Sequence, residues 1–291
     1  MSGLPPFVLL NGRIVPAARA RISVFDRGLL YGDGLFETVR TYAGQPFALD
    51  DHLARLRKSA KQLGLRVPQR DWAGDIERHL RRCRLTSTDA AVRITLTRGA
   101  GAPGLIPPPK LEPTVLMVAT PIAASIERDQ SRGIRVALLP FGRVAFLAEH
   151  KTLDYLPAVL GRMYAQKHGA CEGLYVERGC VSEATTANLF VVRGSRLLTP
   201  PVSGLLPGVT RKLTLEAAAM AGVEVRESVI RANALPRSSE MFITSSLIEV
   251  MPVIQVDGIP IGNGNVGALT RRIQVRYRQI IDQALSLRDS R

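Results

Sequence analysis

The stretch "EHKTLDYL" (149–156) contains one of only six lysines in a chain that carries 39 basic residues. Arginine is the usual basic residue in this sequence, and its side chain does not readily lose a proton. A partly buried lysine can lose its proton and then act as a nucleophile or a base. Lys151 is therefore a candidate for chemistry. The alternative is a surface lysine whose apolar stem lies along the protein.

The composition is that of a globular protein. At 291 residues, with 46% hydrophobic and 22% charged residues, the chain is long enough for one large domain or two ordinary ones. No apolar run reaches the roughly 18 residues of a membrane span, and "MSGLPPFVLLNGR" lacks the charged start of a signal peptide. We therefore expect a cytoplasmic protein with no membrane association. The three cysteines follow no metal or disulfide spacing, so reduced thiols and no metal site are expected.

The net charge of +14 raises a nucleic-acid hypothesis. The arginines are scattered, and "RHLRRCR" (78–84) is the only dense basic cluster. Aromatic residues make up 5% of the chain, too few for the stacking surfaces of nucleic-acid-binding proteins. A solvated basic helix face is the simpler interpretation, although a basic nucleic-acid-binding protein stays as an alternative of a different class. The positive field would favour anionic ligands.

The first 121 residues have the pattern of strands and hairpins with two helices. The Asn-Gly pair within "FVLLNGRIVP" (7–16) predicts a tight hairpin turn. Alternating and short buried apolar runs predict strands, and apolar spacing of three and four predicts helices. Strands are expected at 34–42, 46–49, 90–99 and 113–121, and helices around 53–63 and 71–82.

A polar stretch that ends in glycine, "IAASIERDQSRG" (122–133), is interpreted as a linker between two domains. Strands and helices then alternate to the C-terminus. The predicted organisation is a small N-terminal domain (1–121), a linker (122–133) and a larger C-terminal domain (134–291), in an α/β or α+β fold. Strands are expected at 134–140, 173–178, 189–193, 241–244 and 252–256, and helices near 153–168, 209–221 and 266–285.

Three further segments of the second domain could hold an anion or a charged ring. In "GLLPGVTRKLTL" (204–215) the backbone N–H groups of Val209 and Thr210 could bind a phosphate at a helix start. In "MFITSSLIEVMPV" (241–253) three hydroxylated residues could complete a cradle, or form an ordinary turn. In "CVSEATTANLFVV" (180–192) a lone carboxylate, Glu183, lies between apolar strands and, if buried, needs a cationic or protonated partner. A common helix start and an exposed loop glutamate are the alternatives.

Together with Lys151, these segments meet the requirements of pyridoxal phosphate. The lysine would bind the aldehyde as a Schiff base, the helix start and hydroxyls would hold the phosphate, and the carboxylate would keep the ring nitrogen protonated. No single segment decides the matter.

The whole set resembles the class IV (fold-type IV) pyridoxal-phosphate enzymes. These include branched-chain and D-amino-acid aminotransferases, (R)-selective amine transaminases and aminodeoxychorismate lyase. The resemblance implies a two-domain α/β fold, with a small N-terminal domain and a larger domain with a β-barrel-like core, in a homodimer. It rests on seven motifs in order: "DRGLLYGDGLFETVR", "HLARL", "TRG", "HKTLDYL", "VSEATTANLF", "LPGVTR" and "TSSLIEVMPV".

Site roles are carried over from this resemblance residue by residue. It implies that Lys151 is the Schiff-base lysine and proton shuttle and that Glu183 pairs with the pyridine nitrogen. Leu206 would pack on the ring face. Tyr155 lies four residues after the lysine, one fewer than in typical members. The full set of implied cofactor contacts is Arg55, Lys151, Tyr155, Glu183, Leu206, Gly208, Val209, Thr210, Ser245 and Ser246.

The substrate side is expected on the first domain. Period-2 alternation puts Phe36, Thr38 and Arg40 on one strand face, and Arg93 on a corresponding face of the 90–99 strand. Core packing of Phe36 and solvent exposure of Arg40 are the alternatives. The expected pocket residues are Tyr31, Phe36, Thr38, Arg40 and Arg93.

The motifs conflict over which family member this is. Tyr31, Phe36 and Arg93 match branched-chain aminotransferases, whereas Thr38 resembles aminodeoxychorismate lyase. The loop "TRGAGAPGLIPP" lacks the cationic pair by which D-amino-acid aminotransferases hold a carboxylate. Our primary hypothesis is an aminotransferase that moves an amino group between an amino acid (branched-chain L- or D-) or primary amine and a 2-oxo acid. The alternative is a lyase that releases pyruvate and p-aminobenzoate from aminodeoxychorismate.

Overall fold

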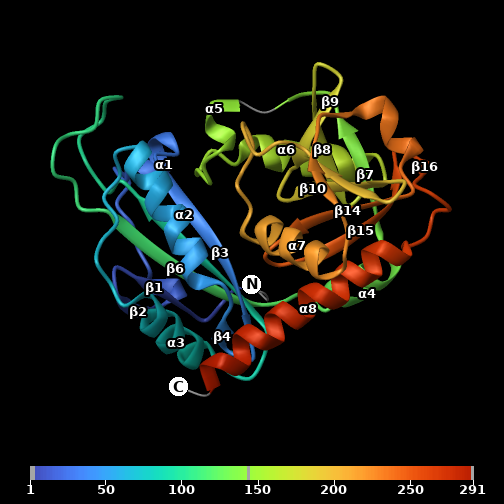
Figure 1. The fold of residues 1–291 in the computed structure, drawn as a ribbon. Helices are drawn as coiled ribbons and strands as arrows, with labels where there is room; N and C mark the ends of the chain where they lie inside the picture. The colour runs from blue at the N-terminus through green and yellow to red at the C-terminus, as the bar shows by residue number, and fades with distance from the viewer. Residues whose placement is uncertain (1–3, 143–144, 290–291) are drawn as a thin grey trace. The chain divides into compact units, whose positions relative to one another are not determined.

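A computed structural model describes residues 4–142 and 145–289, and its contacts divide the chain into two units. The first unit runs to Ile122 and also contains His150–Asp154. The second unit contains Ala123–Glu149 and the chain from Tyr155 onward. Two boundaries differ from the expected ones: the stretch expected as a linker forms α4 (Ser125–Arg132) of the second unit, and Lys151 belongs to the first. Figure 1 shows the elements of each unit.

The first unit is built on a six-stranded sheet with strand order β2-β1-β6-β5-β3-β4. Helix α2 packs on β3, and α3 packs on β1 and β6. Their apolar side chains and those of the sheet form one core that includes Val39, Leu56, Trp72 and Ile94. The elements are β1 (Phe7–Leu10), β2 (Arg13–Pro16), η1 (Ala17–Arg19), α1 (Arg27–Tyr31), β3 (Gly34–Tyr42), β4 (Gln45–Pro46), α2 (Leu49–Gln62), α3 (Trp72–Cys83), β5 (Ala90–Thr97) and β6 (Thr114–Pro121).

Local sequence signals account for much of this unit. Asn11 and Gly12 both have positive φ, 48° and 86°, which is the backbone of the tight turn that an Asn-Gly pair favours. Helix α3 begins after Asp71, whose side chain accepts a hydrogen bond from the backbone of Gly74. The predicted hairpin and this helix are confirmed. Helix α1 was not predicted, because five residues are too few for an apolar period to be recognised.

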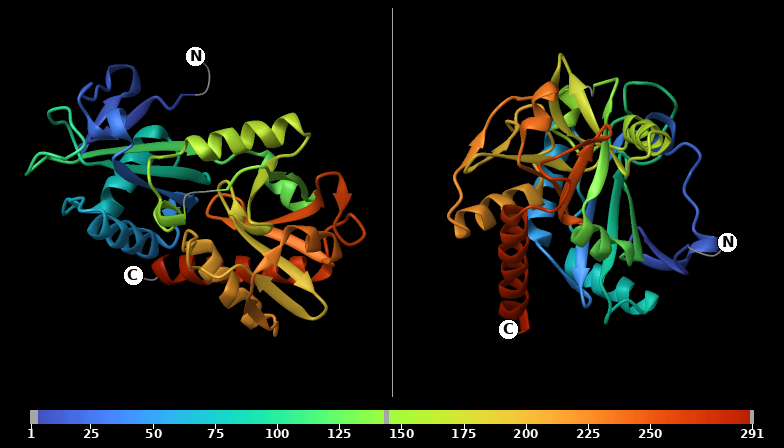
Figure 2. Two further views of the ribbon diagram at one scale, coloured as in Figure 1. Left: turned by 90° about the horizontal axis from the view of Figure 1, so that it is seen from above. Right: turned by 90° about the vertical axis from the view of Figure 1, so that its right-hand side faces the viewer.

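The second unit is built on a ten-stranded sheet with strand order β12-β11-β10-β14-β15-β7-β8-β9-β13, and β16 pairs with β15. Helix α6 packs on β7 and β8, and α7 lies beside α8, which also packs on β15 (Figure 2). The remaining elements are β7 (Ile134–Leu139), α5 (Ala145–Ala148), α6 (Leu156–Lys167), β8 (Glu172–Glu177), β9 (Cys180–Ala184), β10 (Asn188–Arg193), β11 (Arg196–Thr199), α7 (Val209–Met220), β12 (Val225–Glu227), β13 (Ile230–Arg231), η2 (Ala232–Arg237), β14 (Glu240–Ser245), β15 (Glu249–Val256), β16 (Ile259–Pro260) and α8 (Ala268–Asp289).

The surroundings of Lys151 differ from the expected strand-to-helix junction. Helix α5 separates β7 from the lysine, and α6 begins only at Leu156. Pro157 lies in the first turn of α6, as predicted, where its missing N–H breaks no helical hydrogen bond. Lys151 therefore lies in an extended segment rather than at a helix start.

The two mixed α/β units confirm the predicted fold class. Within residues 4–142 and 145–289, none of the helices combines the length and apolarity that a membrane crossing requires. Cys83, Cys171 and Cys180 are free thiols. The described residues contain no cluster of three or more side chains that could bind a metal ion.

Candidate active site

Lys151 is held against the start of β3 by backbone pairing. The backbone N–H of Phe36 donates to the Lys151 carbonyl at 2.9 Å, and the N–H of Leu153 donates to the Gly34 carbonyl at 3.0 Å. This end of β3 is available because β4 pairs only with Thr41 and Tyr42 at the other end. The half-buried Lys151 has its Nζ 4.5 Å from the ring centroid of Phe36. A freely solvated surface lysine is therefore the poorer description.

One face of the β3–β5 pair carries the predicted substrate-side residues. The strand register pairs Thr38 with Arg93, Phe36 with Thr95, and Arg40 with Ala91. The Arg93 guanidinium lies 3.6 Å from the ring centroid of Phe36. This register confirms that Phe36, Thr38 and Arg93 share a face. Their role as a pocket stays a prediction.

Arg40 lies on the same face but binds elsewhere in the first unit. Its Nη2 donates to Asp89 at 2.8 Å, and its guanidinium lies 4.7 Å from the ring centroid of Tyr42. Arg40 is 5% exposed, so the solvent-exposed alternative is wrong. It lies four positions after Phe36 on β3, about 13 Å along the strand.

The other face of β3 carries a buried charged group that sequence reasoning missed. Glu37 accepts hydrogen bonds from Arg55 Nε at 2.8 Å and Nη2 at 2.6 Å, and its Oε2 lies 2.8 Å from His52 Nδ1. Glu37 is fully buried and His52 is 2% exposed. Arg55, expected to reach a phosphate, is thus held by Glu37 at two of its nitrogens. The pattern "HLARL" (52–56), with residues three apart on one helix face, could have indicated this group.

Burial and neighbouring charge act in opposite directions on this group. Burial by itself would raise the pKa of Glu37, but the Arg55 guanidinium and the His52 hydrogen bond lower it to about 2. Burial lowers the pKa of His52, whereas the Glu37 carboxylate raises it. The nearby charges of Arg55 and Lys151 lower it further. Glu37 is therefore ionised, and a positive charge on His52 is disfavoured.

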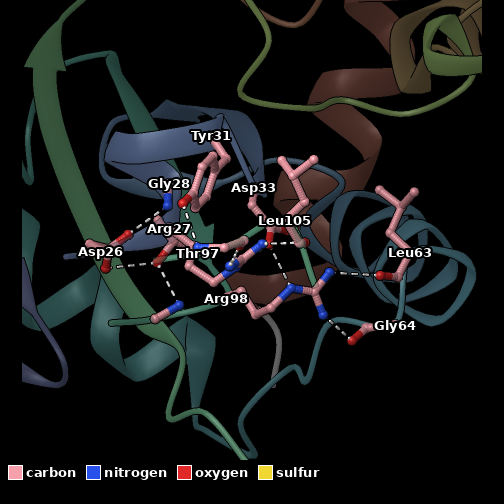
Figure 3. Close-up of polar contacts among 12 residues, drawn as sticks. Asp26, Arg27, Gly28, Tyr31, Asp33, Leu63, Gly64, Thr97, Arg98 and Leu105 are labelled. Carbon is pink, nitrogen blue, oxygen red and sulfur yellow. Dashed lines mark hydrogen bonds and ion pairs between the residues drawn. The ribbon is translucent and has the colours of Figure 1, made fainter. Parts of the chain in front are cut away.

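Tyr31 lies at the end of α1 and is held to the loop after β5 (Figure 3). Its hydroxyl accepts a hydrogen bond from the backbone of Gly104 at 2.8 Å. The guanidinium of Arg27 lies 4.7 Å from the Tyr31 ring centroid and donates to the carbonyls of Gly104 and Leu105 at 2.7 and 3.0 Å. The stretch "GAGAPGL" (99–105) of this loop has no cationic side chain of its own, but Arg27 brings one to it.

Asp33 joins this loop to the core of the first unit. It accepts from Arg27 Nε at 2.8 Å and from Arg98 Nε at 2.7 Å (Figure 3). Arg98 also donates to the carbonyls of Leu63 and Gly64 after α2. Burial would raise the pKa of Asp33, but the two arginines hold it below its ordinary value. The charged groups of Arg27 and Arg98 therefore bind backbone carbonyls and hold these segments in place.

In the second unit, Glu183 is buried on β9 beside Asn188. Glu183 is 3% exposed, so the exposed-loop alternative is wrong. Its Oε2 accepts from Asn188 Nδ2 at 3.3 Å, and the same amide donates to the Leu206 carbonyl at 3.1 Å. Asn188 thereby connects the buried carboxylate to the loop before α7. Sequence reasoning missed Asn188, although a polar residue at the start of the apolar run "NLFVV" is a usable signal.

At the start of α7, position 208 has room for a glycine but not for a residue with a side chain. Gly208 is the N-cap, with no side chain capping the helix, and no acidic residue lies in the first turn. A Cβ at Gly208 would lie 2.0 Å from Asn188 Oδ1. Val209 and Thr210 are the first helical residues and are buried. An uncapped helix start of this kind presents N–H groups and a positive dipole end to an anion.

The hydroxyl-rich end of β14 lies next to β10, the strand that begins with Asn188. Thr244 pairs with Asn188 across the β10–β14 ladder. Thr244 is 1% exposed, and its Oγ1 has no hydrogen-bond partner within the described chain. Ser245 and Ser246 are half-buried. A buried hydroxyl without a partner beside an uncapped helix start fits the donor set that a phosphate requires.

Two predicted features lie outside these groups. Tyr155 is the half-buried residue directly before α6, and its side chain does not cap that helix.

On the basic helix α3, Arg78 pairs with Asp75, Arg81 pairs with Glu77, and Arg82 lies 3.8 Å from the ring centroid of Phe7. These intramolecular partners favour the interpretation of a solvated helix face over a nucleic-acid site.

Comparisons with known proteins identify the family of this chain. The family model for amino-transferase class IV matches residues 34–256. A Methanocaldococcus jannaschii protein, provisionally named a branched-chain-amino-acid aminotransferase, is 35% identical over 94% of this chain and 96% of its own length. A D-alanine aminotransferase of Bacillus licheniformis is 31% identical over 94% of this chain and 96% of its own length. The structure of a T.th. branched-chain amino acid aminotransferase with pyridoxamine 5'-phosphate has a TM-score of 0.85, at 29% identity over 94% of this chain and 93% of that one. The chain belongs to the class IV aminotransferases.

Proposed function

We propose that this protein is a pyridoxal-phosphate-dependent transaminase that moves an amino group from an amino acid or a primary amine to a 2-oxo acid. The observation that carries the proposal is the group in the second unit: the buried Glu183 bonded to Asn188, beside the uncapped start of α7. A buried carboxylate and an anion site in one unit meet the needs of a cationic ring that carries a phosphate.

Bound pyridoxal phosphate supplies an aldehyde that condenses with amino groups and a ring that withdraws electrons from the substrate's α-carbon. Glu183 would stabilise a proton on the ring nitrogen. The N–H groups of Val209 and Thr210, with the Thr210 and Ser246 hydroxyls, would bind the phosphate, and Gly208 would leave room for it. Ser245, Leu206 and Tyr155 would complete the cofactor contacts. Arg55, which Glu37 orients, would contribute positive charge.

Lys151 would hold the cofactor's aldehyde carbon through Nζ and would serve as the base that moves the proton of the substrate's α-carbon. Its attachment to β3 fixes the backbone, while the flexible four-carbon stem would give Nζ the reach that both tasks require. The Phe36 ring, 4.5 Å away, excludes water from one side of the amine.

The substrate lies against the face that carries Phe36, Thr38 and Arg93, with Tyr31 as a further wall residue. Arg93, opposite Thr38 in the ladder, would bind a substrate carboxylate, and Arg40 pairs with Asp89. The relatives include enzymes named for branched-chain amino acids and for D-alanine, so the two configurations of the donor are both candidates. Thr38, opposite Arg93 in the ladder, favours the second candidate, an aminodeoxychorismate lyase, because a hydroxyl there can assist an elimination.

A panel of half-reactions tests the function. The protein loaded with pyridoxal phosphate is mixed separately with L-leucine, D-alanine and (R)-1-phenylethylamine, and the loss of absorbance above 400 nm is followed. Rapid loss with at least one donor, reversed by a 2-oxo acid, is the expected result. No loss with any donor, together with release of p-aminobenzoate from aminodeoxychorismate, would replace the first proposal by the second.

The protein works as a homodimer in this proposal. Helix α1 and the segment before it expose large apolar side chains, among them Phe25 at 53%, Leu29 at 62% and Leu30 at 42%. Contiguous apolar exposure of this kind is typical of an interaction surface. A second copy of the chain is the proposed occupant.

A further inference from the structure

Glu172, at the start of β8, is a fully buried carboxylate with four hydrogen-bond donors. Its Oε1 accepts from the Gly173 backbone at 2.8 Å and from the Thr185 hydroxyl. Its Oε2 accepts from Arg162 Nη1 at 2.7 Å and from the Thr186 hydroxyl at 3.0 Å. Glu172 is 1% exposed. The four donors come from α6, from β8 and from the turn between β9 and β10.

Such a group is difficult to explain by stability alone. Removing the Glu172 carboxylate from water is costly, and its partner Arg162 keeps 52% of its side chain exposed, so this ion pair is weak evidence of a gain in stability. What a fully bonded carboxylate does provide is a single arrangement of the groups that it binds. The question is therefore which groups Glu172 fixes.

It fixes the turn directly after Glu183. Thr185 and Thr186 both donate to Glu172, and the Thr185 backbone donates to the Gly173 carbonyl at 2.9 Å. The turn closes through a bond from the Ala184 N–H to the Ala187 carbonyl at 2.8 Å. Glu183 and Asn188 lie on either side of this turn and bond to each other. A shift of the turn would therefore move the carboxylate and its amide partner.

Packing against α6 also constrains the turn. A Cβ at Gly161 of α6 would lie 2.6 Å from Thr185 Cγ2. Helix α6 thus touches the turn at a glycine, while the same helix supplies Arg162 to Glu172. The turn is enclosed by α6 on one side and β8 on the other.

We propose that Glu172 is a positioning residue for Glu183: through Thr185 and Thr186 it holds the β9–β10 turn so that the Glu183 carboxylate stays at the cofactor's ring nitrogen. The proposal rests on the proposed function, in which Glu183 binds that nitrogen. Glu172 itself touches neither cofactor nor substrate. Its effect on the reaction passes through Glu183.

The test variant is Glu172→Gln. Glutamine keeps the shape, but whichever way its amide is turned, its NH₂ meets a donor, either the Gly173 N–H or the Arg162 guanidinium. The matched control is Glu240→Gln. Glu240 belongs to the same unit and accepts from Leu269 N, Thr270 N and Thr270 Oγ1 at the start of α8. Thr186→Val, which removes a single donor, serves as the milder variant if Glu172→Gln does not fold.

Two readouts are compared. The first is amide hydrogen exchange of peptides covering 180–190 in the cofactor-loaded protein. The second is the rate of the half-reaction with the donor that the wild type uses, L-leucine or D-alanine, in a double-mutant cycle with Glu183→Gln. We expect Glu172→Gln to accelerate exchange at 180–190 and to lower the rate by about 10- to 100-fold, the range seen when a residue that hydrogen-bonds to a metal ligand is replaced. In the Glu183→Gln background it should lower the rate no further.

Other results would overturn the proposal in distinguishable ways. Unchanged exchange at 180–190, or a Glu172→Gln rate defect that multiplies with that of Glu183→Gln, would mean that Glu172 only supports the fold. The same exchange and rate changes in Glu240→Gln would mean the same. If Glu183→Gln alone left the absorbance and the rate of the wild type unaltered, the assignment of Glu183 in the proposed function would fail, and this proposal with it.

Discussion

Glu37 keeps a negative charge inside the first unit because two side chains of α2, His52 and Arg55, bind it directly. Its pKa of about 2, against 4.5 for the free side chain, means that the folded protein holds the ionised form far more strongly than the unfolded chain does. The resulting stability is complete above pH 4.5 and is lost as the pH falls towards 2.

This predicts the behaviour of Glu37→Gln. At neutral pH we expect the variant to lose free energy of unfolding on the order of 3 kcal/mol, measured by urea denaturation. Below pH 4.5 the wild type should lose this advantage, so the two unfolding curves converge. Glu224→Gln is the control, because Glu224 pairs with Arg196 and Arg226 at the surface and such pairs contribute little. Equal pH profiles for wild type and Glu37→Gln would contradict the assignment.

Sequence reasoning at the residue scale found some buried carboxylates and missed others. Glu183 was recognisable because a lone charge between apolar strands needs a partner. Glu37 and Glu172 also lie at apolar strands, in "GLFETV" and "CEGLYV", but their partners come from positions 15 to 18 residues and 10 to 14 residues away. The composition of one stretch does not reveal such partners, because only the folded chain brings them together.

At the scale of elements, the start of α7 carries the proposed phosphate site. We expect Gly208→Ala to weaken the binding of pyridoxal phosphate by at least about 10-fold, because the added Cβ collides with Asn188 Oδ1 and displaces the amide that bonds to Glu183. Titration of the apoprotein with the cofactor, followed by absorbance, measures the effect.

The same substitution elsewhere serves as a control. A Cβ at Gly142 would lie 3.4 Å from its nearest neighbour, an ordinary van der Waals contact. Gly142→Ala should therefore bind the cofactor like the wild type. Wild-type affinity in Gly208→Ala as well would exclude this helix start from the phosphate site.

Regular elements were predictable where a local pattern determines them. The Asn-Gly turn, the alternation in β5 and the apolar stripe of α2 each follow from neighbouring residues. The attachment of Lys151 to β3 does not follow from neighbouring residues. It pairs segments that lie far apart in the chain through backbone hydrogen bonds, which depend on no particular side chain. The polar pattern of 122–133 predicts a linker where the structure has helix α4, because α4 has no buried residue to create an apolar period.

At the scale of the whole molecule, the exposed apolar side chains of α1 predict an association of two copies. We expect Leu29→Lys to shift the protein from dimer to monomer, because a charge within an apolar interface must lose its hydration. Sedimentation velocity at several concentrations measures the shift. Val229→Lys is the control, since Val229 is similarly exposed, at 65%, but lies on the second unit. A monomeric wild type, or a dimeric Leu29→Lys, would exclude this surface as the dimer contact.

The central claim is that Lys151, out of six lysines, carries the cofactor. The most direct measurement is borohydride reduction of the protein with bound pyridoxal phosphate, followed by proteolysis and mass spectrometry of every lysine peptide. We predict one phosphopyridoxyl group, on Lys151, and neither label nor absorbance above 400 nm in Lys151→Ala. A label on another lysine, or a yellow Lys151→Ala protein that still turns over amino donors, would contradict the account.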